Sequence, residues 1–191
     1  GFYLGEHGWF DKRFMYEESF KTPLLIKWPN VIRPGITEDE MVQNLDFAQT
    51  FLAIAGVAPP ADMQGESLVP LLTGEKEKWN REAVYYHYYE YPAEHAVKRH
   101  YGIATKEYKL MHFYYDVNTW ELYDRTADPQ ELNNVYGDPK YVDIAKELQQ
   151  KLEELRKKYR DSDELSDRYI QIYKDNGWIP PVPRASEDGG Q

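Results

Sequence analysis

The feature that most constrains this chain is a series of β-favouring runs followed by one long amphipathic helix. Tyrosine, valine, isoleucine and phenylalanine dominate the runs, and these residue types favour strands. A turn at Lys106–Glu107 separates the second and third runs, which predicts a hairpin. With a short fourth run, we predict an antiparallel sheet of about four strands, an ordinary size. The runs are Ala83–Tyr91, Tyr101–Thr105, Tyr108–Tyr115 and Glu121–Asp124.

The long helix is predicted from Pro139 to Tyr159 because apolar residues recur on one face and lysine and glutamate fill the other. Such a helix is expected to pack on the sheet. A second, short helix is predicted at Glu164–Asp175. The apolar face of the long helix consists of Ile144, Leu148, Leu152, Leu155 and Tyr159.

The opening stretch, Gly1–Trp28, carries many charged side chains on a loop in which two glycines flank Glu6 and His7. Lys12 offers a compact ammonium for an anionic group, and the pKa of a histidine such as His7 lies near neutrality. From spacing alone, an ordinary surface lysine explains Lys12 better, and a loop histidine explains His7 equally well. Glu6 and Asp11 show no metal-ligand spacing, so no metal site is predicted in this chain.

Two further elements follow the opening loop. Pro23–Trp28 is continuously apolar and bounded by prolines, which predicts a buried strand covered on both faces, as in an α/β sheet. Asp46–Ala55 is predicted to be a helix with Asp46 as its N-cap and an apolar face of Phe47, Phe51 and Ile54.

The composition limits the partners. A formal net charge of −10 argues against nucleic acid and anionic membranes. No apolar run approaches the roughly 20 residues of a membrane span. The chain has no cysteine, which excludes disulfides and thiolate chemistry within it.

A small basic cluster suits an acidic sugar, although a solvated loop is the commoner explanation. The cluster consists of His95, Lys98, Arg99 and His100.

The string G-x-x-L-G-E-H-G-x-x-x-K, from Gly1 to Lys12, is followed by Y-E-E-S at Tyr16–Ser19 and P-L-L-I at Pro23–Ile26. In this order the strings resemble the C-terminal half of type I sulfatases, members of the alkaline-phosphatase-like superfamily. The tyrosine-rich strands look most like those of bacterial exo-acting sulfatases on sulfated amino sugars, such as N-acetylglucosamine-6-sulfatases. Further matching pieces are N-x-D…T…AG at 44–56, GESLVPLL at 65–72, YGIATKEYKL at 101–110, and ELYD, DP and E-x-x-N between 121 and 134.

The resemblance implies an alkaline-phosphatase-like α/β fold in three parts. Residues 1–78 would be the C-terminal part of the large α/β domain. Residues 79–178 would form the small subdomain with the antiparallel sheet and its packed helix. Residues 179–191 are expected to be a flexible tail, since they are rich in proline, serine, glutamate and glycine.

The resemblance also implies a chemistry. Lys12 would hold the sulfate and stabilise charge on the ester oxygen, with His7 beside it as a second catalytic residue. Arg99 and His100 would reach over the pocket rim and contact the sugar. Calcium and a formylglycine nucleophile belong to the intact enzyme, and both are expected upstream of Gly1, so this chain by itself is expected to be inactive.

The expected partners are a sulfated carbohydrate, as in glycosaminoglycan or mucin, and the missing N-terminal part of the same protein, in the periplasm or outside the cell. Two alternatives stay open. One is a phosphatase or phosphonate hydrolase of the same superfamily, which the upstream nucleophile motif would distinguish. The other is a non-catalytic carbohydrate-binding module, for which replacing Lys12 would leave turnover unchanged.

Overall fold

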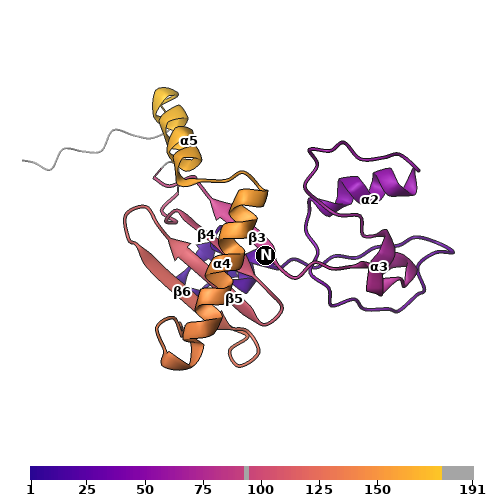
Figure 1. Cartoon of the computed structure of the whole chain (residues 1–191), viewed down its shortest axis with the longest axis horizontal. Coiled ribbons are helices and arrows are strands. Elements are labelled where there is room, and N and C mark those ends of the chain that lie inside the picture. Colours follow the sequence, from indigo (N-terminus) through magenta and orange to yellow (C-terminus); the bar gives the residue numbers. More distant parts are fainter. Residues whose placement is uncertain (93–94, 178–191) are drawn as a thin grey trace, which may run out of the picture.

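A four-stranded antiparallel sheet lies at the centre of one lobe of the computed structural model, which describes residues 1–92 and 95–177 (Figure 1). Each strand pairs with the next along the chain. The predicted sheet is therefore confirmed, including the turn at Lys106–Glu107, while the predicted tail at 179–191 lies outside the described residues. The strands are β3 (Val84–Tyr88), β4 (His100–Ala104), β5 (Tyr108–Phe113) and β6 (Thr119–Asp124).

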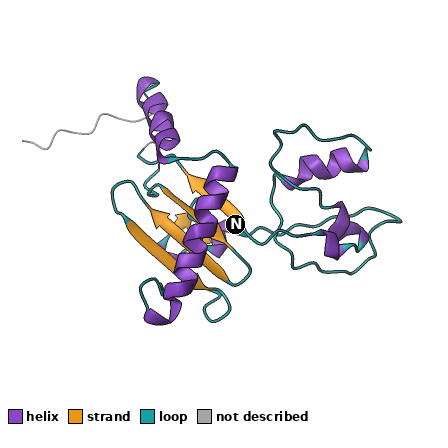
Figure 2. Cartoon of the chain, viewed as in Figure 1, coloured by secondary structure: helices purple, strands orange, loops and turns teal. Residues whose placement is uncertain are grey.

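The long helix α4 (Val142–Lys158) crosses one face of the sheet, as the amphipathic pattern predicts (Figure 2). A 3-10 turn at Pro139–Tyr141 precedes it. Alternate strand residues point toward α4, and Leu110 of β5 packs there with Leu152 of the helix; neither is exposed. Complete burial of one such leucine contributes about 1.5–3 kcal/mol. The short helix α5 (Asp163–Asp175) follows α4 and is also confirmed.

The opening stretch covers the other face of the sheet. It contains β1 (Tyr3–Leu4), β2 (Phe10–Asp11) and α1 (Glu17–Phe20). Its buried side chains join those of β3, β4, β5 and β6 in one core. The sheet is thus enclosed between α4 and the first twenty residues. The core includes Tyr3, Phe14, Met15, Tyr16, Met111 and Phe113.

Gly102 permits this close approach. A Cβ on Gly102 would lie 2.7 Å from the sulfur of Met15 and 2.5 Å from the carbonyl oxygen of Leu110. Only a residue without a side chain lets the opening stretch lie this near to β4. The predicted boundary between two parts of the chain near residue 78 stays a prediction. Residues 1–20, which precede this boundary, pack on the small sheet.

A second lobe holds α2 (Asp46–Ile54) and α3 (Val69–Thr73). The helix predicted at Asp46–Ala55 is confirmed as α2, but the expected role of Asp46 as its N-cap is wrong. Its buried carboxylate instead accepts two hydrogen bonds from the Arg81 guanidinium, at 2.5 and 2.7 Å. Thr50 is buried on the same face, where its hydroxyl accepts from the Leu68 backbone at 2.8 Å.

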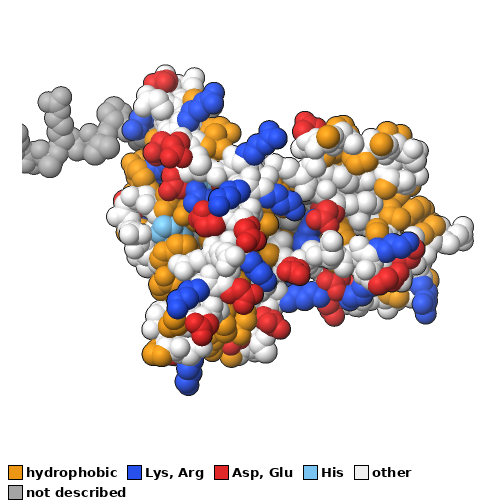
Figure 3. All heavy atoms as spheres, in the orientation of Figure 1, with side chains coloured by type: hydrophobic (Ala, Val, Ile, Leu, Met, Phe, Trp, Pro, Cys, Tyr) orange, Lys and Arg blue, Asp and Glu red, His pale blue; other side chains and the backbone are white. Residues whose placement is uncertain are grey.

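The apolar face of α2 points outward instead of inward. Phe51 is 70% exposed and Ile54 is 44% exposed. Figure 3 shows hydrophobic side chains on the outer side of this lobe. No described element covers the face, so the polar side with its ion pair is the buried one.

The strand predicted at Pro23–Trp28 is wrong for this structure. The segment has no regular structure, and Leu25 is 95% exposed. A buried strand needs a neighbour for its backbone hydrogen bonds and apolar cover on both faces. No described residues supply these to this segment.

Candidate functional site

The hairpin of β1 and β2 brings together the two residues of the opening loop that the resemblance singles out. The strands pair antiparallel, with Tyr3 opposite Asp11. His7 lies in the 3-10 turn Glu6–Gly8 between them, and Lys12 follows directly after β2. One short hairpin therefore presents an imidazole and an ammonium.

The backbone of this hairpin is held in unusual conformations. His7, Asp11 and Arg13 have φ values of 52°, 87° and 100°. Left-handed backbone at a non-glycine residue costs on the order of 1–3 kcal/mol and persists only where the surroundings impose it. Here the Arg13 N–H donates to the Ser19 hydroxyl at 2.9 Å, and the Tyr86 hydroxyl of β3 donates to the Arg13 carbonyl at 2.6 Å.

The His7 side chain is 11% exposed and lies face to face with the ring of Tyr16, with 4.2 Å between centroids and 7° between planes. Its Nε2 lies 3.3 Å from the Glu18 carboxylate, although without the geometry of a hydrogen bond. Nε2 is therefore buried in this structure, with a carboxylate beside it.

Lys12 is exposed, and it forms no ion pair or hydrogen bond with a residue in the described ranges. Its neighbour Arg13 differs, because the guanidinium is paired with Asp11 and lies near Glu90. The ammonium of Lys12 is thus the cation of this hairpin that is available to an anionic ligand.

The structure does not place His100 on an exposed rim. Its side chain has no exposed surface and packs beside the rings of Phe14 and Phe113, with centroids at 5.6 and 4.9 Å. Its Nδ1 bonds to the Lys98 carbonyl at 2.8 Å. Burial lowers the pKa of His100 to about 4, so the imidazole is neutral at pH 7. The reason is strand alternation, which points this residue of β4 into the core.

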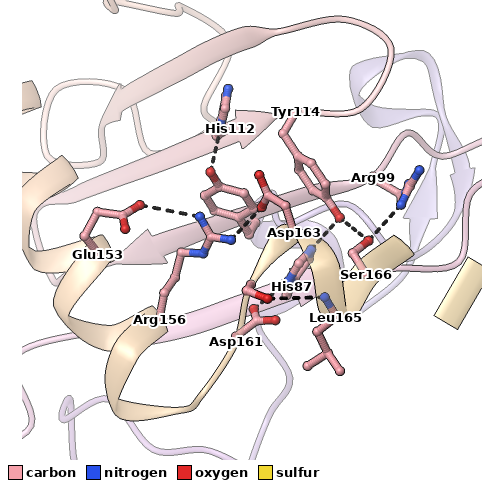
Figure 4. A network of polar contacts seen from close by, with 12 residues as sticks. His87, Arg99, His112, Tyr114, Glu153, Arg156, Asp161, Asp163, Leu165 and Ser166 are labelled. Carbon is pink, nitrogen blue, oxygen red and sulfur yellow. Dashed lines mark hydrogen bonds and ion pairs between the residues drawn. The ribbon is translucent and has the colours of Figure 1, made fainter. Parts of the chain in front are cut away.

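Arg99 is also buried, at 1% exposure, in a polar network shown in Figure 4. Its guanidinium lies 3.5 Å from the centroid of the Tyr115 ring and donates to the Ser166 hydroxyl of α5 at 2.8 Å. Ser166 in turn contacts the Tyr114 hydroxyl at 2.6 Å. Arg99 therefore fastens α5 to the sheet, and a sugar has no direct access to it in this arrangement.

The same network continues through His87 of β3, which bonds to the Tyr114 hydroxyl through Nε2 at 2.7 Å and to Asp161 through Nδ1 at 2.6 Å. Tyr85 and Tyr89 also donate to the Asp161 carboxylate. Burial alone would raise the pKa of Asp161, but these hydrogen bonds lower it to about 2. The network is internal and holds α5 in place.

A buried charge cluster, which the sequence patterns did not predict, joins the opening stretch to the sheet. Lys109 of β5 contacts Glu131 at 2.7 Å and Glu17 of α1 at 3.2 Å. Arg125 contacts Glu17 at 2.8 Å. Strand alternation was the available signal, since it places Lys109 on the same face as the buried Met111.

Within residues 1–92 and 95–177, no three histidine, aspartate or glutamate side chains are placed to hold a metal ion. The calcium implied by the resemblance thus has no ligand set in this part of the chain. None of the described helices combines the length and apolar character needed to cross a membrane.

Comparison with known families gives the hairpin and sheet their context. Residues 5–158 match the family described as N-sulphoglucosamine sulphohydrolase, C-terminal. The chain belongs to this family. Its match covers His7 and Lys12, the second strand of their hairpin, the whole four-stranded sheet and α4.

The relatives of this sulphohydrolase-family chain are sulfatases. It is 57% identical over 166 residues to an N-acetylglucosamine-6-O-sulfatase of Bacteroides thetaiotaomicron, which covers 85% of the chain and 30% of that protein. It is 33% identical over 135 residues to a Δ4,5-hexuronate-2-O-sulfatase of the same organism, covering 69% of the chain and 27% of the relative. The chain therefore spans about a third of the length of these curated relatives.

A solved structure also resembles this chain. It is described as a complex with its substrate D-glucosamine-2-N,6-O-disulfate, and it matches with a TM-score of 0.81 and 57% identity over 85% of this chain and 33% of that one. The predicted α/β fold of the alkaline-phosphatase-like superfamily, with a small sheet and packed helix, is confirmed.

Proposed function

We propose that these residues form the C-terminal part of a carbohydrate sulfatase and that the β1–β2 hairpin supplies part of its sulfate site. The observation that carries the proposal is an exposed Lys12, without an ion-pair partner in the part of the chain that the structure describes, at the exit of a conformationally constrained hairpin. The chain is 57% identical to an N-acetylglucosamine-6-O-sulfatase. The substrate class follows from that relative: a 6-O-sulfated glucosamine derivative.

Lys12 binds a sulfate oxygen in this proposal. As the S–O ester bond breaks, negative charge grows on the ester oxygen, and a fixed ammonium stabilises this charge most in the transition state. The φ values on either side of Lys12 support a fixed position, because the backbone at Asp11 and Arg13 is held in conformations that ordinary residues rarely adopt.

His7 is the second catalytic residue of the proposal. Its imidazole edge faces Glu18 and can donate a proton or a hydrogen bond to the oxygen of the leaving sugar. Arg99 and His100 enter only as internal residues, since both are buried. The nucleophile and the calcium ligands are proposed to lie in the N-terminal part of the full-length protein, which acts in the periplasm or outside the cell.

The experiment uses the full-length protein that contains this chain, assayed on a panel of sulfated monosaccharides and phosphate monoesters. Lys12→Ala is expected to lower turnover of the preferred sulfated sugar on the order of 10²-fold or more. Lys21→Ala is the matched control, because Lys21 is an equally exposed lysine just after α1. A loss of only a few-fold at Lys12 would refute its role, and faster turnover of phosphate esters would refute the sulfatase assignment.

A further inference from the structure

The ring of Tyr16 is the surface on which the His7 imidazole rests. The two rings are parallel to within 7°, with centroids 4.2 Å apart. Within the described ranges the imidazole Nε2 has no hydrogen-bond partner, so ring contacts provide the orientation on this side of the loop. Tyr3 adds an edge contact at 6.1 Å. The stack covers one face of the imidazole, and its Nε2 is buried beside the Glu18 carboxylate at 3.3 Å.

Tyr16 is itself fixed by the small sheet. It is 9% exposed, and its hydroxyl donates to Oε2 of Glu121 in β6 at 2.7 Å. The Tyr123 hydroxyl donates to the same carboxylate oxygen at 2.9 Å, and the Tyr123 ring meets Tyr16 edge-on at 5.9 Å. Burial and the Glu121 carboxylate raise the pKa of Tyr16, so its hydroxyl stays protonated and remains a donor.

We infer that Tyr16 is a positioning residue for His7 and that Glu121 fixes Tyr16, so that the C-terminal sheet sets the orientation of the catalytic imidazole. The inference rests on the proposed function insofar as His7 acts on the substrate.

The kinetic test compares three variants of the full-length protein. Tyr16→Leu removes the stacking ring and is expected to lower kcat about tenfold or more through loss of alignment, with KM nearly unchanged. Tyr16→Phe keeps the ring, loses the bond to Glu121, and is expected to lower kcat roughly threefold. Tyr123→Phe is the matched control, since it removes a hydrogen bond to the same carboxylate oxygen on a ring that has no stacking contact with His7.

A double-mutant cycle separates positioning from general structural damage. If Tyr16 acts through His7, the double variant His7→Ala/Tyr16→Leu has the same kcat as His7→Ala alone. Independent, multiplicative losses would overturn the inference. If His7→Ala alone leaves turnover intact, the catalytic role of His7 in the proposed function fails instead.

NMR of the labelled His7 imidazole decides the positioning role without reference to turnover. Loss of the tyrosine face in Tyr16→Leu is expected to change the ring-current shifts of His7, whereas Tyr123→Phe leaves them unchanged. Unaltered His7 resonances in Tyr16→Leu would overturn the inference. Should that variant not fold, Tyr16→Phe and Glu121→Ala decide it on the same measurements, and equality of both with Tyr123→Phe would overturn it.

Discussion

The ammonium of Lys109 lies 2.7 Å from the carboxylate of Glu131, and both side chains are fully buried between the sheet and the opening stretch. The backbone N–H of Glu17 donates to the Glu131 carboxylate at 3.0 Å. The side-chain carboxylate of Glu17 contacts Lys109 and Arg125. Burial alone would raise the pKa of Glu17, but these two cations lower it. The charge cluster therefore ties α1, and with it the candidate hairpin, to the small sheet.

Lys109→Met is expected to lower the free energy of unfolding by about 3–5 kcal/mol, because it leaves the Glu131 carboxylate buried without its main cation. The double variant Lys109→Met/Glu131→Leu is expected to recover most of that loss. Urea titration of the chain measures both. Lys106→Met, which removes a half-exposed lysine paired with Glu40, is expected to cost less than about 1 kcal/mol. Equal losses of unfolding free energy in Lys106→Met and Lys109→Met would contradict the stabilising role assigned to the buried Lys109–Glu131 pair.

His100 is expected to make the protein less stable as the pH falls from 6.5 toward 4. Burial lowers its pKa to about 4, so the unfolded chain takes up a proton in this interval and the folded chain does not. The difference corresponds to about 3 kcal/mol, at 1.36 kcal/mol per pH unit. Burial also lowers the pKa of His87, which adds a loss of the same sign.

The measurement is the free energy of unfolding at pH 7 and at pH 4.5. His100→Asn removes the titrating group, so the difference between the two pH values should shrink whatever the variant's stability at pH 7. His95→Asn, at a partly exposed histidine, should retain the full difference. If the pH dependence of the unfolding free energy is unchanged in His100→Asn, the expected effect of burial on the His100 pKa is wrong.

The outward-facing side of α2 is expected to be covered in the full-length protein. Phe51 and Ile54 expose apolar surface that soluble proteins seldom leave contiguous. Phe51→Ser is therefore expected to change the stability of the 191-residue chain by less than about 0.5 kcal/mol. In the full-length protein it should cost about 3 kcal/mol or more.

Thermal unfolding of both forms tests this expectation. Phe113→Ala is the comparison, since Phe113 is 6% exposed here and its loss should destabilise both forms. A neutral Phe51→Ser in the full-length protein would mean that this face stays open to solvent.

Local periodicity was sufficient to predict the four-stranded sheet, α2, α4 and α5, but it also predicted a strand at Pro23–Trp28 that does not form. The apolar stripe of α4 and the period-two pattern of the strands depend on residues close in sequence, so the sheet, its hairpin and the helices were predictable. Charge and spacing alone favoured an ordinary surface role for Lys12, and only the resemblance raised it to a candidate site residue. The structure then showed Lys12 exposed, on one hairpin with His7.

The sequence by itself determined the four-stranded sheet with its packed helix, the helices α2 and α5, and the sulfatase resemblance. The tertiary structure decided that the opening stretch encloses the sheet's second face, that α2 buries its polar side, and that His100 is internal. It also decided that Tyr16 bonds to Glu121, 105 residues away. The physical reason is that spacing specifies which face of an element is apolar or charged, whereas burial depends on distant segments that meet only when the chain folds.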